Sequence, residues 1–291
     1  MGSSPRQLLR EGELRLNTTH SPRICCEWVL SELLDTGRTA LYLEERTVPQ
    51  EVCQKYFQII NAIREGHPSQ YLVGKASFMG DEFWVTPDCF IPRPETEVLV
   101  EACLDYFQRF GKVRAGREKG LLWVDIGTGS GCIAISLTKR SSCSKMLAID
   151  LVEKTLRVAR QNGQQHGVSD RILWVCGDLF GPLPKGFEAD AIVSNPPYIP
   201  SGQMDFLPPE VRREPRMSLE GGESGLHFYE RIAEEVPPYL AEEGFLFLEI
   251  GDYQEAPVRG IFSESAFRLL EVRNDLCGRP RVMIFQKGFH G

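Results

Sequence analysis

The sequence lacks the features that would place it in several special classes of protein. Its 291 residues contain no apolar run long enough to cross a bilayer, and the N-terminus lacks the apolar segment of a signal peptide. No block rich in lysine and arginine is present, and the net charge is −7 at pH 7, whereas a non-specific nucleic-acid binder usually needs a basic face. We therefore expect a cytoplasmic protein that does not contact a membrane or bind nucleic acid directly.

Cysteine and histidine patterns typical of metal sites are also missing. None of the nine cysteines forms a C-x-x-C pair, and several, including Cys103 and Cys132, lie in apolar runs where a reduced thiol packs like a small hydrophobic side chain. The five histidines show no metal-ligand spacing and no arrangement with serine and aspartate for nucleophilic catalysis. We expect neither a metal ion nor a disulfide framework.

Three regions of the chain differ in pattern. Helical spacing in C-C-E-W-V-L-S-E-L-L-D and V-C-Q-K-Y-F-Q-I-I-N-A-I-R predicts a small helical domain over residues 1–72. Two aromatic-bearing runs around M-G-D predict a β-hairpin, and F-I-P-R-P-E-T-E predicts an extended path before a helix that begins near Thr96. Residues 73–94 are therefore expected to be a hairpin and connector, and residues 95–291 a third region.

Strand and helix patterns alternate from about residue 95 onward. We predict strands over 121–126, 145–150, 171–178, 189–195 and 244–250, and helices over 131–140, 152–166 and 226–240. Such alternation is typical of an α/β fold with a mainly parallel sheet and helices on both faces. The last two runs, 267–273 and 281–286, have no helix between them and are predicted to pair antiparallel at the sheet edge.

A glycine-rich loop, D-I-G-T-G-S-G, follows the first predicted strand. Glycines allow a sharp turn and bring backbone N–H groups close to a ligand at a helix N-terminus. The spacing does not fit G-x-G-x-x-G, because residue 132 is cysteine, and it does not fit G-x-x-x-x-G-K-[ST] either. The loop nevertheless lies where open α/β sheets bind ligands. The residues predicted to contact a cofactor here are Gly127, Thr128, Gly129, Ser130 and Gly131.

Carboxylates end the next two predicted strands. Asp150 is placed to accept both hydroxyls of an adenosine ribose, and Asp178, followed by Leu179, is placed to reach an adenine. Asp125, just before the glycine loop, is placed to orient a bound amine. Each residue alone is more simply interpreted as a solvated strand end. Together, at successive strand ends beside a glycine loop, they predict a cofactor that carries adenosine.

The fourth predicted strand ends in N-P-P-Y. Pro196 and Pro197 cannot continue a strand because they have no N–H to donate, so the chain leaves the sheet at Asn195. Asn195 Oδ1 and the Pro196 carbonyl can each accept one N–H of a planar amide or amine, and Tyr198 can pack on its face. We predict that all four residues bind substrate, that Asn195, Pro196 and Tyr198 act in catalysis, and that Asn195 also borders the cofactor. The alternative is an ordinary Asx-turn after a strand.

In combination, these motifs resemble the HemK/PrmC family, the peptide chain release factor N5-glutamine methyltransferases, within the class I S-adenosylmethionine-dependent methyltransferases. N-P-P-Y alone also occurs in adenine-N6 methyltransferases, but the connector and a later glycine segment make the resemblance specific, and it covers nearly the whole chain. The motifs that carry it are F-I-P-R-P-E-T-E, D-I-G-T-G-S-G, S-N-P-P-Y-I, L-E-G-G-E-S-G-L and D-L-C-G-R-P-R.

The resemblance implies a Rossmann-like seven-stranded sheet and S-adenosyl-L-methionine as cofactor, with S-adenosyl-L-homocysteine as product. It also implies that the substrate is the glutamine of the Gly-Gly-Gln motif in class I release factors, and that the N-terminal helices contribute to docking of that partner. We expect the chain to act as a monomer.

Several alternatives stay open at this point. Arg93, Glu95 and Glu97 of the connector either close over the cofactor or form a salt-bridged linker. The segment from Glu220 to Gly225 either forms a flap beside the amide pocket or is a plain loop. The rival functions are an adenine-N6 methyltransferase acting on DNA or RNA, a related glutamine methyltransferase acting on a ribosomal protein, and a non-catalytic binding protein of the same fold.

Overall fold

The computed structural model describes residues 3–16, 21–43, 47–114, 121–141, 144–263 and 265–288. Contacts within the chain divide it into two units. The first comprises the residues up to Lys75 together with Leu207–Arg213, and the second comprises Ala76–Phe206 and the residues from Glu214 onward. The boundaries at residues 72 and 94 stay predictions. The sequence did not predict that residues 207–213 belong with the N-terminal helices.

The first unit is helical, as expected. Its helices α1, α2, α3, α4 and α5 span Pro5–Arg15, Pro22–Leu33, Ala40–Leu43, Gln50–Arg64 and Ser69–Val73. Their apolar faces meet in a core that contains Leu8, Leu30 and Tyr56. A capping box begins α1, because the Ser4 hydroxyl accepts from the Gln7 backbone N–H while the Gln7 side chain accepts from the Ser4 backbone N–H.

The segment Leu207–Arg213 contacts the residues that follow α4 in this unit. Arg213 Nη2 donates to the Glu65 carbonyl at 3.2 Å. A Cβ atom at Gly66 would lie 2.7 Å from Pro209 Cβ, and Gly66 has a φ of +83°. Both the close approach and the left-handed backbone require glycine at this position.

The expected hairpin consists of β1 (Lys75–Phe78) and β2 (Asp81–Trp84). Met79 and Gly80 between them both have positive φ, 53° and 76°, as in the two-residue turns that match the strand twist. Asn162 of α8 (Glu153–Gln165) fixes the end of the hairpin, because its Oδ1 accepts from Trp84 N at 2.7 Å and its Nδ2 donates to the Trp84 carbonyl at 3.0 Å.

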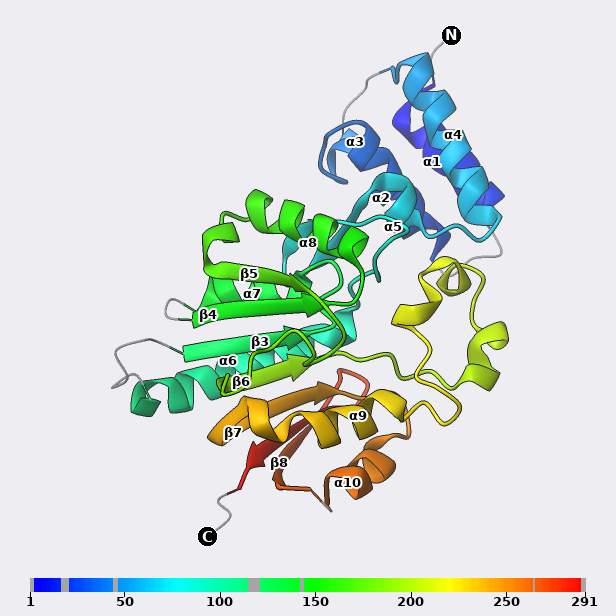
Figure 1. Cartoon of the computed structure of the whole chain (residues 1–291). Helices are drawn as coiled ribbons and strands as arrows, with labels where there is room; N and C mark the ends of the chain where they lie inside the picture. The colour runs from blue at the N-terminus through cyan, green and yellow to red at the C-terminus, as the bar shows by residue number, and fades with distance from the viewer. Residues whose placement is uncertain are drawn as a thin grey trace. The chain divides into compact units, whose positions relative to one another are not determined.

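The second unit contains a seven-stranded sheet of order β5-β4-β3-β6-β7-β9-β8 (Figure 1). The strands β3 to β9 span Leu121–Ile126, Ser144–Asp150, Ile172–Cys176, Ala189–Ser194, Leu240–Glu249, Phe267–Asn274 and Pro280–Lys287. Strands β3 to β7 run parallel, and β9 pairs antiparallel with both β7 and β8. The predicted fold class and the antiparallel pair at the edge are confirmed.

Helices cover both faces of this sheet. One face packs against α6 (Pro94–Arg114) and α7 (Cys132–Arg140), and the opposite face packs against α9 (His227–Glu235) and α10 (Glu255–Ser263) (Figure 1). Side chains alternate along each strand, so Trp123 faces the first layer while Val124 faces the second. Because β3 to β6 are parallel, their carboxyl ends meet at one edge of the sheet, where the predicted ligand site lies.

Three boundaries differ from the prediction for physical reasons. The helix expected to reach Leu240 ends at Glu235, since Pro237 and Pro238 lack the N–H groups that would continue it. The strand β7 consequently begins at Leu240, earlier than expected. The helix α6 begins at Pro94 rather than near Thr96. The 3-10 helices span Ser169–Arg171, Ser201–Phe206, Val211–Arg213, Arg216–Ser218 and Pro237–Tyr239.

Candidate active site

The glycine loop turns the chain from the end of β3 into α7. Gly127, Gly129 and Gly131 all have positive φ, at 73°, 57° and 82°. The N–H groups of Gly127 and Thr128 donate to the Ile149 carbonyl at 2.9 and 3.0 Å, which holds the loop against β4. A Cβ atom at Gly127 would meet no atom within 4 Å, so the loop leaves open space above its backbone.

Gly131 has a different role from the other two glycines. A Cβ atom there would lie 3.0 Å from Ile135 Cδ1 and 3.1 Å from the Trp174 ring, because the start of α7 packs tightly on β5. Gly131 therefore serves helix packing, and it is the one predicted cofactor contact that does not line the cavity described below.

Asp125 lies beneath the loop and not in the ligand space. Its side chain is fully buried, and Oδ2 accepts from the Thr128 hydroxyl at 2.6 Å and from Ala134 N at 3.2 Å. Burial raises the pKa of Asp125 to about 7, opposed by these two hydrogen bonds. The predicted contact between Asp125 and a bound amine finds no support in this position, since the carboxylate braces the loop from below.

Asp150 ends β4 with its carboxylate facing the glycine loop. Oδ2 accepts from Gly129 N at 2.9 Å, and Oδ1 accepts from Val152 N at 3.0 Å. Burial raises the pKa of Asp150, and the two backbone hydrogen bonds act against that shift. Each oxygen keeps a lone pair for a further donor. Two adjacent hydroxyl groups are the ligand that this arrangement suits.

Asp178 and Leu179 follow β5 at the next strand end. Asp178 forms a two-pronged ion pair with Arg231 of α9, with nitrogen–oxygen distances of 3.1 and 3.0 Å, and Glu235 engages the same guanidinium at 2.9 Å. Leu179 has a φ of +43°, a conformation that costs about 1–3 kcal/mol for a residue other than glycine. Both residues line the cavity, and no pattern in the sequence indicated the partner Arg231.

The N-P-P-Y segment leaves the end of β6 as predicted. Asn195 Nδ2 donates to the Thr96 hydroxyl at 3.1 Å, so Oδ1 is the amide atom left to accept from a ligand. The carbonyl of Tyr198 accepts from Gln254 Nε2 at 3.0 Å. Burial raises the pKa of Tyr198, which keeps its phenol neutral. All four residues of N-P-P-Y line the same cavity as Asp150.

The glycine segment after Leu219 runs alongside N-P-P-Y. Ile199 N donates to the Leu219 carbonyl at 2.9 Å, and Gly221 N donates back to the Ile199 carbonyl at 2.8 Å. A Cβ atom at Gly221 would lie 2.7 Å from the Pro197 carbonyl oxygen, and one at Gly225 would lie 2.5 Å from that of Tyr198. The glycines are therefore needed for close backbone approach. The segment therefore packs against the N-P-P-Y run of Asn195, Pro196, Pro197 and Tyr198, which we call the clamp. This supporting role differs from both expectations, the flap and the plain loop.

The connector forms another wall of the cavity. Glu214, which is buried, accepts from Ile91 N at 3.1 Å and pairs with the Arg93 guanidinium. That guanidinium also lies 4.9 Å from the centre of the Phe90 ring. Of the two interpretations of the connector, the contacts of Arg93 favour the salt-bridged linker, and they hold Phe90 against the ligand space.

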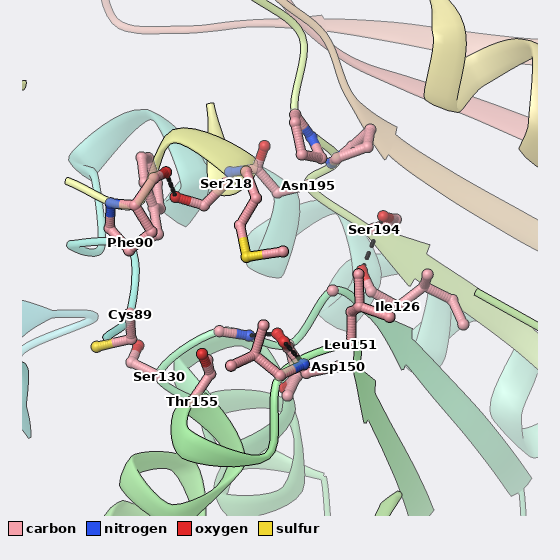
Figure 2. A pocket seen from close by; sticks show the side chains of 18 of the residues that line it. Cys89, Phe90, Ile126, Ser130, Asp150, Leu151, Thr155, Ser194, Asn195 and Ser218 are labelled. Atoms are coloured by element: carbon pink, nitrogen blue, oxygen red, sulfur yellow. Dashed lines mark hydrogen bonds between the residues drawn. The ribbon is translucent and has the colours of Figure 1, made fainter. Parts of the chain in front are cut away.

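These elements enclose a cavity of about 300 Å³. Figure 2 shows Asp150 and Asn195 on opposite sides of it, with Cys89 and Phe90 of the connector along another side. The predicted site residues are thus brought together, apart from Gly131. The lining residues that sequence reasoning missed include Phe90, Thr96, Leu151, Met217 and Phe228. The connector motif that contains Phe90 and Thr96 was the only signal available for any of them.

Comparison with known proteins identifies the family. The PrmC N-terminal domain matches residues 7–74, and the methyltransferase small domain matches residues 115–207. A release factor glutamine methyltransferase from Aquifex aeolicus is 35% identical over 262 residues, 90% of each chain. One from Moorella thermoacetica is 36% identical over 96% of this chain and 97% of its own. This chain belongs to the release factor glutamine methyltransferases.

Solved structures agree on the fold. The hMettl16 catalytic domain, in complex with MAT2A 3′UTR hairpin 6, matches with a TM-score of 0.55 at 15% identity over 83% of each chain. A methyltransferase from Pyrococcus furiosus matches with a TM-score of 0.51 at 17% identity, over 73% of this chain and 92% of its own. At such identities the likeness concerns the methyltransferase fold alone.

As a member of this family, the chain is a transferase whose cofactor is S-adenosyl-L-methionine. The residues present fit that group. The space above Gly127 and Gly129 is open, and Asp150 offers two acceptors beside it. Within the described ranges, no group of three or more His, Cys, Asp and Glu side chains could hold a metal ion. The same part of the chain has no helix both long and apolar enough to cross a membrane.

Proposed function

We propose that this chain methylates the side-chain amide nitrogen, N5, of the glutamine in the Gly-Gly-Gln motif of class I release factors. The observation that carries the proposal is the orientation of Asn195. Its Nδ2 is engaged by Thr96, which presents Oδ1 as an acceptor at the end of β6, opposite the Asp150 side of the same cavity.

The clamp acts on a poor nucleophile. The nitrogen lone pair of an amide is delocalised into its carbonyl, so the nitrogen must be held in line with the reacting methyl group. Asn195 Oδ1 and the Pro196 carbonyl each accept one N–H of the substrate, while Tyr198 packs on the flat amide. Both acceptors bind more strongly as positive charge develops on nitrogen, so they favour the transition state over the ground state.

The rest of the cavity holds the cofactor. When bound, S-adenosyl-L-methionine supplies an electrophilic methyl group on a positively charged sulfur. Gly127, Thr128, Gly129 and Ser130 line the space that would hold it, and Asp150 would accept hydrogen bonds from the ribose hydroxyls. Asp178 and Leu179 border the adenine, and the apolar wall that includes Phe90 excludes water. No strong base is needed, because a methylated amide nitrogen that carries positive charge loses its proton readily to water.

The proposal also names the protein partner, the cellular compartment and the oligomeric state. The helices of the first unit contribute to docking of the release factor, and the chain works in the cytoplasm as a monomer without binding nucleic acid directly. The acidic net charge of −7 supports the last point, because the phosphate backbone attracts basic surfaces. An adenine-N6 enzyme would use the same clamp on an exocyclic amine, but the relatives named above favour the amide.

The test uses labelled S-adenosyl-L-methionine with three acceptors offered separately. These are purified release factor, its variant with alanine for the glutamine of Gly-Gly-Gln, and bulk nucleic acid. We expect label on the intact release factor alone. Label on nucleic acid would favour the adenine-N6 function, and label on neither, with cofactor bound, would favour a non-catalytic binding protein.

A further inference from the structure

A buried polar network lies behind Asn195, and of its members Thr96 also lines the cavity, whereas Glu249 and Arg281 do not. It consists of Thr96 on α6, Glu249 at the end of β7 and Arg281 on β9, which are 2%, 1% and 7% exposed. Burying a carboxylate to this degree is costly unless it is paired or hydrogen-bonded. Glu249 is such a buried carboxylate, and it does not contact the substrate amide or the cofactor in the proposed mechanism.

The hydrogen bonds and ion pairs of Arg281 go to groups other than Glu249. Its Nη1 donates to the Ile250 carbonyl at 3.0 Å, and its Nη2 pairs with Asp252 at 2.8 Å and with Asp275 at 3.4 Å. Among the described residues, Arg281 Nε and Glu249 Oε2 are both buried and have no hydrogen-bond partner. The carboxylate is thus not neutralised by a direct ion pair.

Glu249 follows Leu248, which pairs with Ser194 in the parallel ladder of β6 and β7, so Glu249 lies beside Asn195 at the ends of neighbouring strands. Thr96 and Asn195 both stabilise the charged form of Glu249 and so lower its pKa. A carboxylate can only accept hydrogen bonds. Beside an ionised Glu249, Asn195 must therefore turn its Nδ2 inward, and the Thr96 hydroxyl can donate to the carboxylate while its oxygen accepts from Asn195 Nδ2 at 3.1 Å. The donors all point from the cavity toward Glu249.

We propose that Glu249 is a positioning residue that fixes the direction of this chain of hydrogen bonds and so keeps Asn195 Oδ1 facing the substrate amide. The inference rests on the proposed function of Asn195 as an acceptor. A neutral side chain at 249 can donate to Thr96, whose hydroxyl can then donate to Asn195. In that reversed chain Asn195 presents Nδ2 to the cavity, where it meets the N–H₂ of the substrate donor to donor.

Protonation of Glu249 has the same consequence as removal of its charge. Burial raises the pKa of Glu249 to about 7, with Thr96, Asn195 and the charge of Arg281 acting in the opposite direction and the charge of Glu95 adding to the rise. The other polar groups facing it are the phenols of Tyr198 and Tyr229, which stay neutral because burial raises the pKa of each. Clamp activity is therefore expected to fall as pH drops through about 7.

The central experiment compares Glu249→Gln with wild type, using Glu234→Gln as the matched control. Gln has nearly the shape of Glu but can donate, whereas Glu234 is an exposed carboxylate on α9. We expect kcat to fall by between about 10-fold and 100-fold in Glu249→Gln. Losses of this size are typical when a residue that orients a metal ligand is replaced, and Glu249 orients Asn195 in a comparable way. The KM of Glu249→Gln for cofactor should stay within about twofold of wild type, because the clamp does not bind the cofactor's ribose or adenine. The kcat of Glu234→Gln should also stay within about twofold of wild type, because Glu234 does not contact the clamp.

Two further readouts separate positioning from a structural role. The kcat of wild type should be about tenfold lower at pH 6 than at pH 8, and Glu249→Gln should lack this acidic limb. The side-chain amide signals of Asn195 in a ¹⁵N spectrum, assigned by their loss in Asn195→Ala, should shift with an apparent pKa of about 7 in wild type only. The NMR measurement needs no substrate.

The outcomes distinguish the inference from the proposed function. If wild type does not methylate release factor but the Asn195 signals titrate as stated and do not in Glu249→Gln, the proposed function fails and the coupling between Glu249 and Asn195 stands. If wild type methylates release factor and Glu249→Gln retains its rate and its acidic limb, Glu249 has no positioning role. Signals of Asn195 that are unchanged in Glu249→Gln would overturn the inference as well.

Discussion

Replacement of Asp150 gives the sharpest prediction for the cofactor site. Its two oxygens each accept one backbone N–H, from Gly129 at 2.9 Å and from Val152 at 3.0 Å, and each can accept one ribose hydroxyl in addition. A hydrogen bond to a charged group contributes about 1.5–3 kcal/mol. Loss of two such bonds in Asp150→Ala should weaken binding by about 3 kcal/mol, which is about 100-fold in Kd.

The assay is calorimetric titration of S-adenosyl-L-methionine into wild type, Asp150→Ala and a control. The control is Glu153→Ala, at the exposed start of α8, where the carboxylate pairs with Arg160. An exposed ion pair of this kind contributes about 0–1 kcal/mol, so Kd in the control should be nearly unchanged. Asp150→Ala also deprives two backbone N–H groups of their acceptor, so its melting temperature should fall slightly.

A cofactor analogue that lacks one ribose hydroxyl tests the assignment independently of folding. Wild type should bind the analogue about tenfold more weakly than the cofactor, whereas Asp150→Ala should bind the two about equally, because the hydroxyl has no partner left to lose. If folded Asp150→Ala binds the cofactor within about threefold of wild type, the assignment of Asp150 to the ribose is wrong.

Three other predictions concern Asn195, Gly225 and the buried acid Asp125. Asn195→Ala should lower kcat by about 100-fold to 1000-fold, as loss of one preorganised oxyanion-hole partner does, with cofactor Kd unchanged by calorimetry; normal turnover would contradict the clamp. Gly225→Ala should lower both activity and melting temperature, since its Cβ would lie 2.5 Å from the Tyr198 carbonyl oxygen, whereas Gly202→Ala, with no atom within 4 Å, should do neither. Burial raises the pKa of Asp125 to about 7, so the folded chain keeps a proton that the unfolded chain releases from about pH 4. The contribution of Asp125 to the free energy of unfolding should therefore fall as pH rises from 4 to 7. In urea titrations, the free energy of unfolding of wild type relative to Asp125→Asn should fall over this range, and a constant difference would contradict the reasoning.

Short stretches of sequence were enough to predict the strands and turns that carry the site residues. The apolar runs around Trp123, Leu147 and Ile192 predicted three adjacent parallel strands, because strands covered on both faces read as unbroken hydrophobic sequence. Glycines and prolines then marked where the chain leaves the sheet. The helix α10 was not predicted, since Pro257 and Gly260 are poor helix formers, although a proline in the first turn loses no hydrogen bond.

Pairings between distant parts of the chain had no signal in the sequence. Glu214 reaches Arg93 across 121 positions, and Arg231 engages Asp178 across 53. Glu249 in a strand was interpreted only as part of an apolar run, although it is the buried acid next to the clamp. Periodicity reports which face of an element is covered, but it does not report which polar partner from another element fills that face.

The most direct measurement of the central claim is to locate the transferred methyl group. Release factor is incubated with S-adenosyl-L-methionine and either wild type or Asn195→Ala, and its peptides are mapped by mass spectrometry. With wild type, we predict one added methyl group on the side-chain nitrogen of the glutamine in Gly-Gly-Gln. With an Asn195→Ala protein that binds cofactor normally, we predict no methylation above background. A methyl group on any other residue, or equal methylation by the two proteins, would contradict it.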